Sequence, residues 1–164
     1  MDSYLVPRSA RLFPTQKSRS FHIERNTIYT SDKFNTYNDW FYFIHIDPYL
    51  RWVHAFGMVV GVIFFSISFY NFWILGLNSF PITLCLIGTF FFYFLPLLSH
   101  YYYDGGGAKS SPDSYLSTFI PVIHINLLTL TGRYDRWLRK FIIKYPFTVE
   151  AWELVERAKK LKIP

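Results

Sequence analysis

The feature that most constrains this chain is an uncharged stretch of about fifty residues. No Asp, Glu, Lys or Arg occurs between Trp52 and Tyr103. Such a stretch is too long for one membrane span, but it suits two helices of roughly 20 to 25 residues each, joined by a tight turn. The segment GLNSFP, residues 76–81, supplies that turn. We therefore predict an all-α membrane protein built on a transmembrane helical hairpin, with spans at about 50–75 and 80–103.

Residues near the ends and the middle of these spans support their placement. Asp47 and Pro48 fit the N-cap and first position of a helix, because proline lacks the N–H group that a helix start leaves unpaired. Pro96 predicts a kink near the end of the second span. Gly57 and Gly61 form a pair of small residues one turn apart, which permits close approach of the two spans.

The distribution of charge around the hairpin predicts its topology. The 164-residue chain is 51% hydrophobic, with a formal net charge of +6. Seven Lys and Arg residues lie at or before Arg51 and ten lie at or after Lys109, whereas the turn contains none. The positive-inside rule therefore places both ends of the hairpin on the same face of the membrane. Binding to nucleic acid is not expected, because the charge flanks membrane segments and no phosphate-binding glycine loop occurs.

A third uncharged segment follows the hairpin at residues 114–131. It is interrupted by Pro121, His124 and Asn126. A full span and a re-entrant segment buried against the hairpin both fit this pattern. We assign the membrane domain to residues 39–131.

Residues 132–164 are predicted to form C-terminal amphipathic and charged helices. Within residues 134–145 the aromatic and aliphatic side chains form one stripe, and most basic side chains lie off it. This pattern fits an interfacial helix on anionic lipid head groups, and it equally fits a helix packed on a partner protein. After Pro146, we expect a soluble helix capped by Thr148.

Residues 1–38 are polar, basic and dotted with aromatic residues, without helical or strand periodicity. Their Arg and Ser content is similar to that of a mitochondrial presequence, although Asp2 and Glu24 are atypical of one. A two-helix hairpin has little hydrophobic core against which such a segment could pack. We therefore expect an extended N-terminal arm that lies across neighbouring subunits.

Histidines are placed to gather near one face of the membrane. His54 lies one turn inside the start of the first span and His100 one turn inside the end of the second, so an antiparallel hairpin brings them to the same level. His45 precedes the first span, and Asp104 follows His100 by one helical turn. His124 can return with the third segment. These five residues are the candidate metal ligands.

The spacing leaves three interpretations of this set open. Two or three histidines with a carboxylate and open coordination positions suit non-haem Fe(II), whereas a filled tetrahedral set suits structural zinc. Histidines near a membrane interface also often form only hydrogen bonds to backbone or lipid.

One segment resembles a known family. HIDPYLRWVHAFG, residues 45–57, is similar to the opening signature of the membrane-bound Fe(II)-dependent 2-hydroxy fatty acid dioxygenases. The pattern H-x-x-P-x-x-R-x-x-H-x-x-G is matched by His45, Pro48, Arg51, His54 and Gly57. A second signature, a histidine followed four residues later by an acid, is matched by His100 and Asp104. The resemblance covers about residues 38–131.

This resemblance implies a multi-spanning enzyme that shortens 2-hydroxy fatty acids by one carbon through alpha-oxidation. It would make His45, His54, His100 and Asp104 the iron ligands. Arg51 would then pair with the substrate carboxylate. The chain departs from the family after Asp104, where GGGAKSSPD stands in place of a polar, proline-containing stretch, and it has fewer predicted spans.

Two functions from different classes therefore fit the sequence. In the first, the chain is an accessory subunit of a multi-subunit membrane complex, such as a respiratory complex of the mitochondrial inner membrane, and contacts other subunits and lipids. In the second, it is an Fe(II)-dependent dioxygenase of 2-hydroxy fatty acids, in the same membrane or in the endoplasmic reticulum. We expect the accessory subunit, because ordering long extensions costs conformational entropy, and a small free-standing enzyme does not need such extensions.

Overall fold

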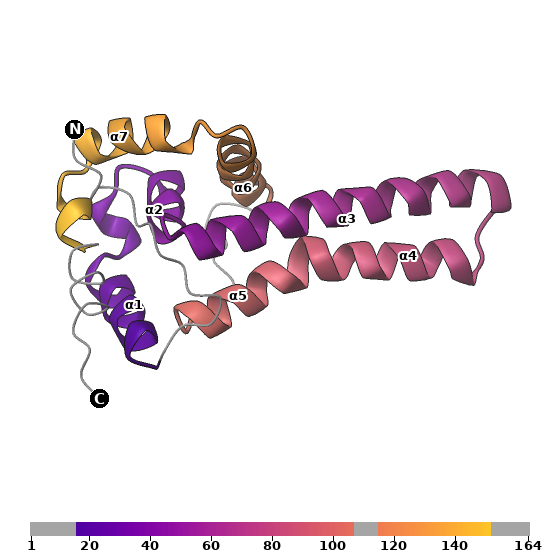
Figure 1. Cartoon of the computed structure of the whole chain (residues 1–164), viewed down its shortest axis with the longest axis horizontal. Coiled ribbons are helices and arrows are strands. Elements are labelled where there is room, and N and C mark those ends of the chain that lie inside the picture. The colour runs from indigo at the N-terminus through magenta and orange to yellow at the C-terminus, as the bar shows by residue number, and fades with distance from the viewer. Residues whose placement is uncertain (1–15, 107–114, 152–164) are drawn as a thin grey trace.

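The computed structural model describes residues 16–106 and 115–151 of the chain. Over these residues the protein is helical and contains no strand. A long hairpin projects from a group of shorter helices, as Figure 1 shows. The hairpin is built from α3 (Pro48–Leu75), α4 (Ser79–Thr89), a π-helical segment η2 (Phe90–Phe94) and α5 (Leu95–Tyr103). The shorter elements are α1 (Gln16–Ile28), the 3-10 turn η1 (Ser31–Lys33), α2 (Tyr37–Ile44), α6 (Tyr115–Leu130) and α7 (Tyr134–Lys144).

The two arms of the hairpin are long and apolar enough to cross a membrane, which confirms the prediction of two membrane-length helices. The first arm is α3, and the second runs without a break from Ser79 to Tyr103. Asp47 caps α3, since its side chain accepts a hydrogen bond of 2.9 Å from the backbone N–H of Tyr49. Gly76 ends α3 with a φ of 70°, a conformation that glycine adopts without strain.

Small residues let the two arms pack closely. A Cβ added to Gly61 would lie 2.6 Å from the Cβ of Phe92, and one added to Gly57 would collide with a backbone carbonyl of the opposite arm. Near the turn, the Ser68 hydroxyl donates a hydrogen bond of 2.7 Å to the carbonyl of Pro81. Close backbone approach and hydrogen bonding across the interface are the main attractive contacts available to helices in lipid.

The second arm changes its helical register just before Pro96. Proline has no N–H group for the usual bond to the carbonyl four residues earlier. The preceding segment is π-helical, and the N–H of Leu95 reaches back to the carbonyl of Phe90. One extra residue in a turn rotates everything that follows by roughly 100° about the helix axis. This rotation sets the direction in which α5 presents His100.

The main hydrophobic core lies outside the hairpin, among α2, α6, α7 and the turns beside them. Its buried members are Phe34, Phe43, Ile44, Ile46, Ile125, Tyr134, Leu138, Phe141, Tyr145 and Ala151. The apolar stripe of α7 packs into this core, and the basic residues Arg136, Arg139 and Lys140 point outward. The stripe is therefore covered by the chain itself, and contact of the outward-pointing basic face with lipid head groups stays a prediction.

A cluster around Asp39 attaches α7 to α2. The Asp39 carboxylate accepts hydrogen bonds of 2.8 Å from both the Lys144 ammonium and the Tyr145 hydroxyl. Residues 147–151 are helical, but the Thr148 hydroxyl donates to the carbonyl of Tyr145 and does not cap the helix as predicted. The rest of the predicted C-terminal helix, residues 152–164, lies outside the described residues.

Helix α6 runs across the base of the hairpin. Figure 1 views it nearly end-on, whereas α3 and α4 lie along the plane of the view. The helix has 16 residues, fewer than the roughly 20 that a full span requires. It contacts α3 through a face that includes buried Ile125 and Asn126, and it exposes Ile120 and Leu127 on the other side. This geometry disfavours the full span considered for residues 114–131.

The N-terminal segment differs from the predicted extended arm. Residues 1–15 lie outside the described residues, but Gln16–Ile28 form helix α1, which packs against the end of α5. The His22 ring lies 4.5 Å from the Tyr103 ring, measured between centroids. The expectation of an extended arm with few contacts to its own hairpin is therefore wrong for this helix. Hydrophobic periodicity did not indicate α1 because much of its buried surface is polar.

Candidate metal centre

Three of the predicted histidines converge where the hairpin joins the shorter helices. His45 ends α2, His54 lies in the second turn of α3, and His100 lies near the end of α5. One ring nitrogen from each lies within 4.8 Å of the others, and the three could hold a metal ion. Their exposed fractions are 0%, 6% and 4%, so the cluster is almost sealed from solvent. We call these residues the histidine cluster.

The hydrogen bonds of two of the rings indicate which nitrogen carries the proton. His45 Nδ1 lies 2.7 Å from the carbonyl oxygen of Phe41, and His100 Nδ1 lies 3.1 Å from Asp104 Oδ2. Both oxygens can only accept, so each Nδ1 is assigned the hydrogen. In neutral rings the two Nε2 atoms are then unprotonated. They nevertheless lie only 3.0 Å apart.

Two unprotonated nitrogens at this distance repel each other unless a proton or a metal cation lies between them. A proton is disfavoured, because burial, together with the neighbouring His100, lowers the pKa of His45 to about 3. His54 adds a third ring nitrogen to the group, and its buried Nε2 has no hydrogen-bond partner among the described residues. Metal–nitrogen bonds of about 2.0 to 2.2 Å would place nitrogens roughly 3 to 3.5 Å apart, in the range of the observed His45–His100 distance. The donor set therefore fits a metal cation.

Asp104 lies behind His100 and is not part of the cluster itself. Its Oδ2 accepts the hydrogen bond from His100, and its Oδ1 accepts one of 2.8 Å from the backbone N–H of Gly106. Burial raises the pKa of Asp104. The contacts with His100 and Gly106 and the charge of Arg25 lower this pKa by more than burial raises it, so the carboxyl is ionised. A carboxylate behind a metal-binding imidazole fixes the orientation of the ring and raises its basicity. Asp104 thus lies outside the group of three histidines that could hold a metal ion, and its role as a direct ligand stays a prediction.

The glycines that follow have the expected effect on the helix end. Asp104 is the C-cap of α5, and Gly105 has a φ of 65°. This left-handed conformation ends the helix directly after the carboxylate. Gly107 lies outside the described residues.

Two further candidates lie elsewhere. His124 is exposed on α6 and shares a hydrogen bond of 2.8 Å with the Tyr42 hydroxyl. Because α6 crosses the hairpin, this face of the helix meets α2 and α7, and His124 does not reach the cluster. Arg51 is buried with its guanidinium 3.4 Å from the centre of the Tyr134 ring. That position next to α7 provides a cation–π contact.

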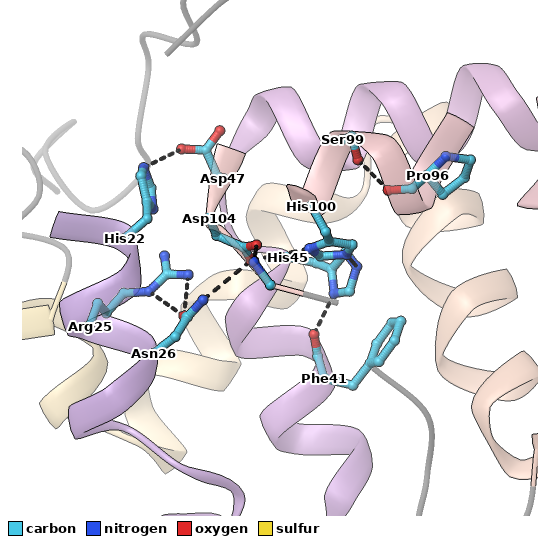
Figure 2. Close-up of polar contacts among 11 residues, drawn as sticks. His22, Arg25, Asn26, Phe41, His45, Asp47, Pro96, Ser99, His100 and Asp104 are labelled. Carbon is cyan, nitrogen blue, oxygen red and sulfur yellow. Dashed lines mark hydrogen bonds and ion pairs between the residues drawn. The ribbon is translucent and has the colours of Figure 1, made fainter. Parts of the chain in front are cut away.

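The contribution of α1 was not predicted from the sequence. His22 and Arg25 are almost fully buried, and Asn26 donates a hydrogen bond of 3.2 Å to Asp104. Figure 2 shows Arg25 and Asn26 pointing from α1 toward Asp104, and His22 pointing toward Asp47. The only available signal was their spacing, which places them on one helical face.

No protein-family model, curated protein or solved structure matches this chain. The chemistry of the histidine cluster is therefore inferred from its donor atoms, its burial and its partners. Three neutral imidazoles without a thiolate suit Fe(II) or zinc, and three ligands leave coordination positions open.

Proposed function

We propose that this protein is a membrane-bound, iron-dependent dioxygenase of 2-hydroxy fatty acids. The observation that carries the proposal is the histidine cluster, in which His45 and His100 direct unprotonated nitrogens at one point and His54 supplies a third. The residues of the cluster are also those on which the resemblance to the dioxygenase family rests. Bound Fe(II) would supply the redox chemistry that activates dioxygen.

The buried charges support an anionic substrate. Among the described residues, Asp47 and Asp104 are buried carboxylates, and Arg25 and Arg51 are buried guanidinium groups. These charges cancel formally, and imidazoles bind metal ions as neutral ligands. A divalent ion in the cluster would therefore carry an uncompensated charge in a buried site, which is costly. A carboxylate ligand, such as that of a 2-hydroxy acid, would reduce this cost.

The aromatic residues around the cluster support a position at the membrane boundary. Trp52, Tyr101 and Tyr102 have exposed fractions of 55%, 61% and 59%, and each lies within two residues of a cluster histidine. Exposed Trp and Tyr side chains are typical of the level of lipid head groups. A fatty acid in the bilayer carries its carboxylate at this same level, so the carboxylate end of the substrate would lie nearest the cluster.

Both ends of the hairpin are proposed to lie on one side of the membrane, with the turn on the other. Cysteine labelling tests this in a chain whose single cysteine, Cys85, is replaced by Ser. Ser31 and Asn78, which are both exposed, are each replaced by Cys in separate variants. In sealed vesicles of uniform orientation, a membrane-impermeant maleimide should label only one of the two variants until the vesicles are opened. Labelling of both variants in sealed vesicles would contradict the hairpin topology.

The dioxygenase proposal is tested with purified full-length protein. We expect about one iron per chain after anaerobic reconstitution with Fe(II), and dioxygen uptake on addition of a 2-hydroxy fatty acid. The products should be the acid that is one carbon shorter, CO2 from the lost carboxyl carbon, and water, which balances the uptake of one dioxygen per substrate. The matched control is the same fatty acid without the 2-hydroxyl group, which should cause no uptake. Iron-loaded protein that consumes no dioxygen with either acid would reject the activity.

The second candidate is an accessory subunit of a membrane complex, for which a respiratory complex of the mitochondrial inner membrane is the proposed setting. It is favoured by the near-complete burial of the histidine cluster, because closed sites are typical of structural metals. In this case the chain purified from its native membrane should contain zinc in place of iron. Other subunits should purify with it, and it should show no dioxygenase activity. The packing of α1 on its own hairpin removes the main reason for preferring this candidate, since that helix does not need a neighbour for support.

A further inference from the structure

A continuous line of hydrogen bonds joins helix α1 to the histidine cluster. The Arg25 guanidinium donates from Nε and Nη2 to the Asn26 side-chain oxygen, at 3.0 and 2.7 Å. The Asn26 side-chain nitrogen donates to Asp104 Oδ2 at 3.2 Å, and the same oxygen accepts from His100 at 3.1 Å. Figure 2 shows Arg25, Asn26 and Asp104 in this order, leading to the cluster.

The direction of each bond in this line is set by chemistry. A guanidinium group can only donate, so Arg25 donates to the oxygen of the Asn26 amide. This leaves the NH₂ group of the amide facing Asp104. Asp104 thus receives donors from three separate segments, namely α1, α5 and the backbone at Gly106. The carboxylate is held in the one orientation that also meets the Nδ1–H of His100.

We propose that Asn26 is a positioning residue of the metal centre, which orients the Asp104 carboxylate and through it the His100 ring. The inference rests on the histidine cluster as the metal site of the proposed function. Arg25 supports Asn26 from behind, so α1 is part of the centre although it supplies no ligand. Partners beyond the first ligands typically change metal affinity by roughly 10- to 100-fold when removed.

The test measures Co(II) affinity of the full chain in detergent, which requires no turnover. Asn26→Ala should weaken Co(II) binding by roughly 10- to 100-fold. The isosteric Asn26→Asp should also weaken it, because it replaces the donor facing Asp104 by an acceptor and keeps the contact with Arg25. The matched control is Thr27→Ala on the same helix, which should leave binding unchanged, because the Thr27 side chain is exposed and its hydroxyl donates to the carbonyl of Ile23 within α1. Circular dichroism verifies that each variant is folded.

A double-mutant cycle separates positioning from a general effect on the packing of α1. In an Asp104→Asn background, Asn26→Ala should change Co(II) affinity by less than about twofold, because its effect passes through the carboxylate. An equal loss in both backgrounds, or wild-type affinity in the Asn26 variants, would overturn the inference, as would a wild-type chain that binds no Co(II). Absence of dioxygenase activity in a chain that binds metal and shows this coupling would instead reject only the proposed function.

Discussion

Replacement of His54 by Ala is expected to abolish metal binding, while the same replacement at His124 leaves it intact. Within the described part of the chain the buried His54 Nε2 has no hydrogen-bond partner, so the replacement removes one of three donors and breaks no hydrogen bond of that atom seen there. The loss of affinity should exceed the roughly 10- to 100-fold effects of residues beyond the first ligands. Co(II) titration and metal analysis of the purified chain measure it.

His124→Ala is the matched control because it removes the same side chain from the same membrane domain. His124 is exposed, and its hydrogen bond is to Tyr42 on the other side of α6 from the hairpin arm. Equal metal content in the two variants would show that binding does not depend on the cluster. A loss in His124→Ala alone would place the metal site at Tyr42 and α6, contrary to the assignment made here.

Gly61→Leu is expected to separate the arms of the hairpin. Even a Cβ at this position would lie 2.6 Å from the Cβ of Phe92, so a leucine side chain cannot be placed without moving one arm. Overpacking usually costs about 1 to 3 kcal/mol, and a backbone collision in a long interface lies at or beyond the upper end of this range. Because His54 and His100 lie on opposite arms, the variant should melt at lower temperature in detergent and bind Co(II) more weakly.

Ser66→Leu is the control for added bulk on the same helix. Ser66 is exposed on α3, and its hydroxyl bonds to the carbonyl of Val62 within the helix. A leucine there would face lipid or detergent, and it should leave both melting temperature and metal binding near wild type. If Gly61→Leu behaved like Ser66→Leu, the close approach of the arms would not support the cluster.

If the His54 and Gly61 variants behave as expected, the two results together would link the hairpin to the candidate site. The hairpin would serve as the frame that holds His54 and His100 at one level, and α1 and α2 would close the site from the water side.

Several features followed from the sequence alone because they depend on local patterns. The uncharged stretch sets the length of both arms, and Asp47, Pro48 and Gly76 mark where α3 begins and ends. The level of His54 and His100 follows from their distance to the helix ends once the arms are antiparallel. For these reasons three of the five candidate ligands are found together.

The tertiary structure decided which polar residues surround the cluster and in what role. Asp104 was placed behind His100 by the helix end at Gly105, and His124 was turned toward Tyr42 by the crossing of α6. Such outcomes depend on how helices pack across long sequence separations, which no local pattern specifies. Helix α1 is the clearest case, because it is held by charge and hydrogen bonds to Asp104. Periodicity detects burial only where the buried side chains are apolar, so a helix buried by its polar face is visible only in three dimensions.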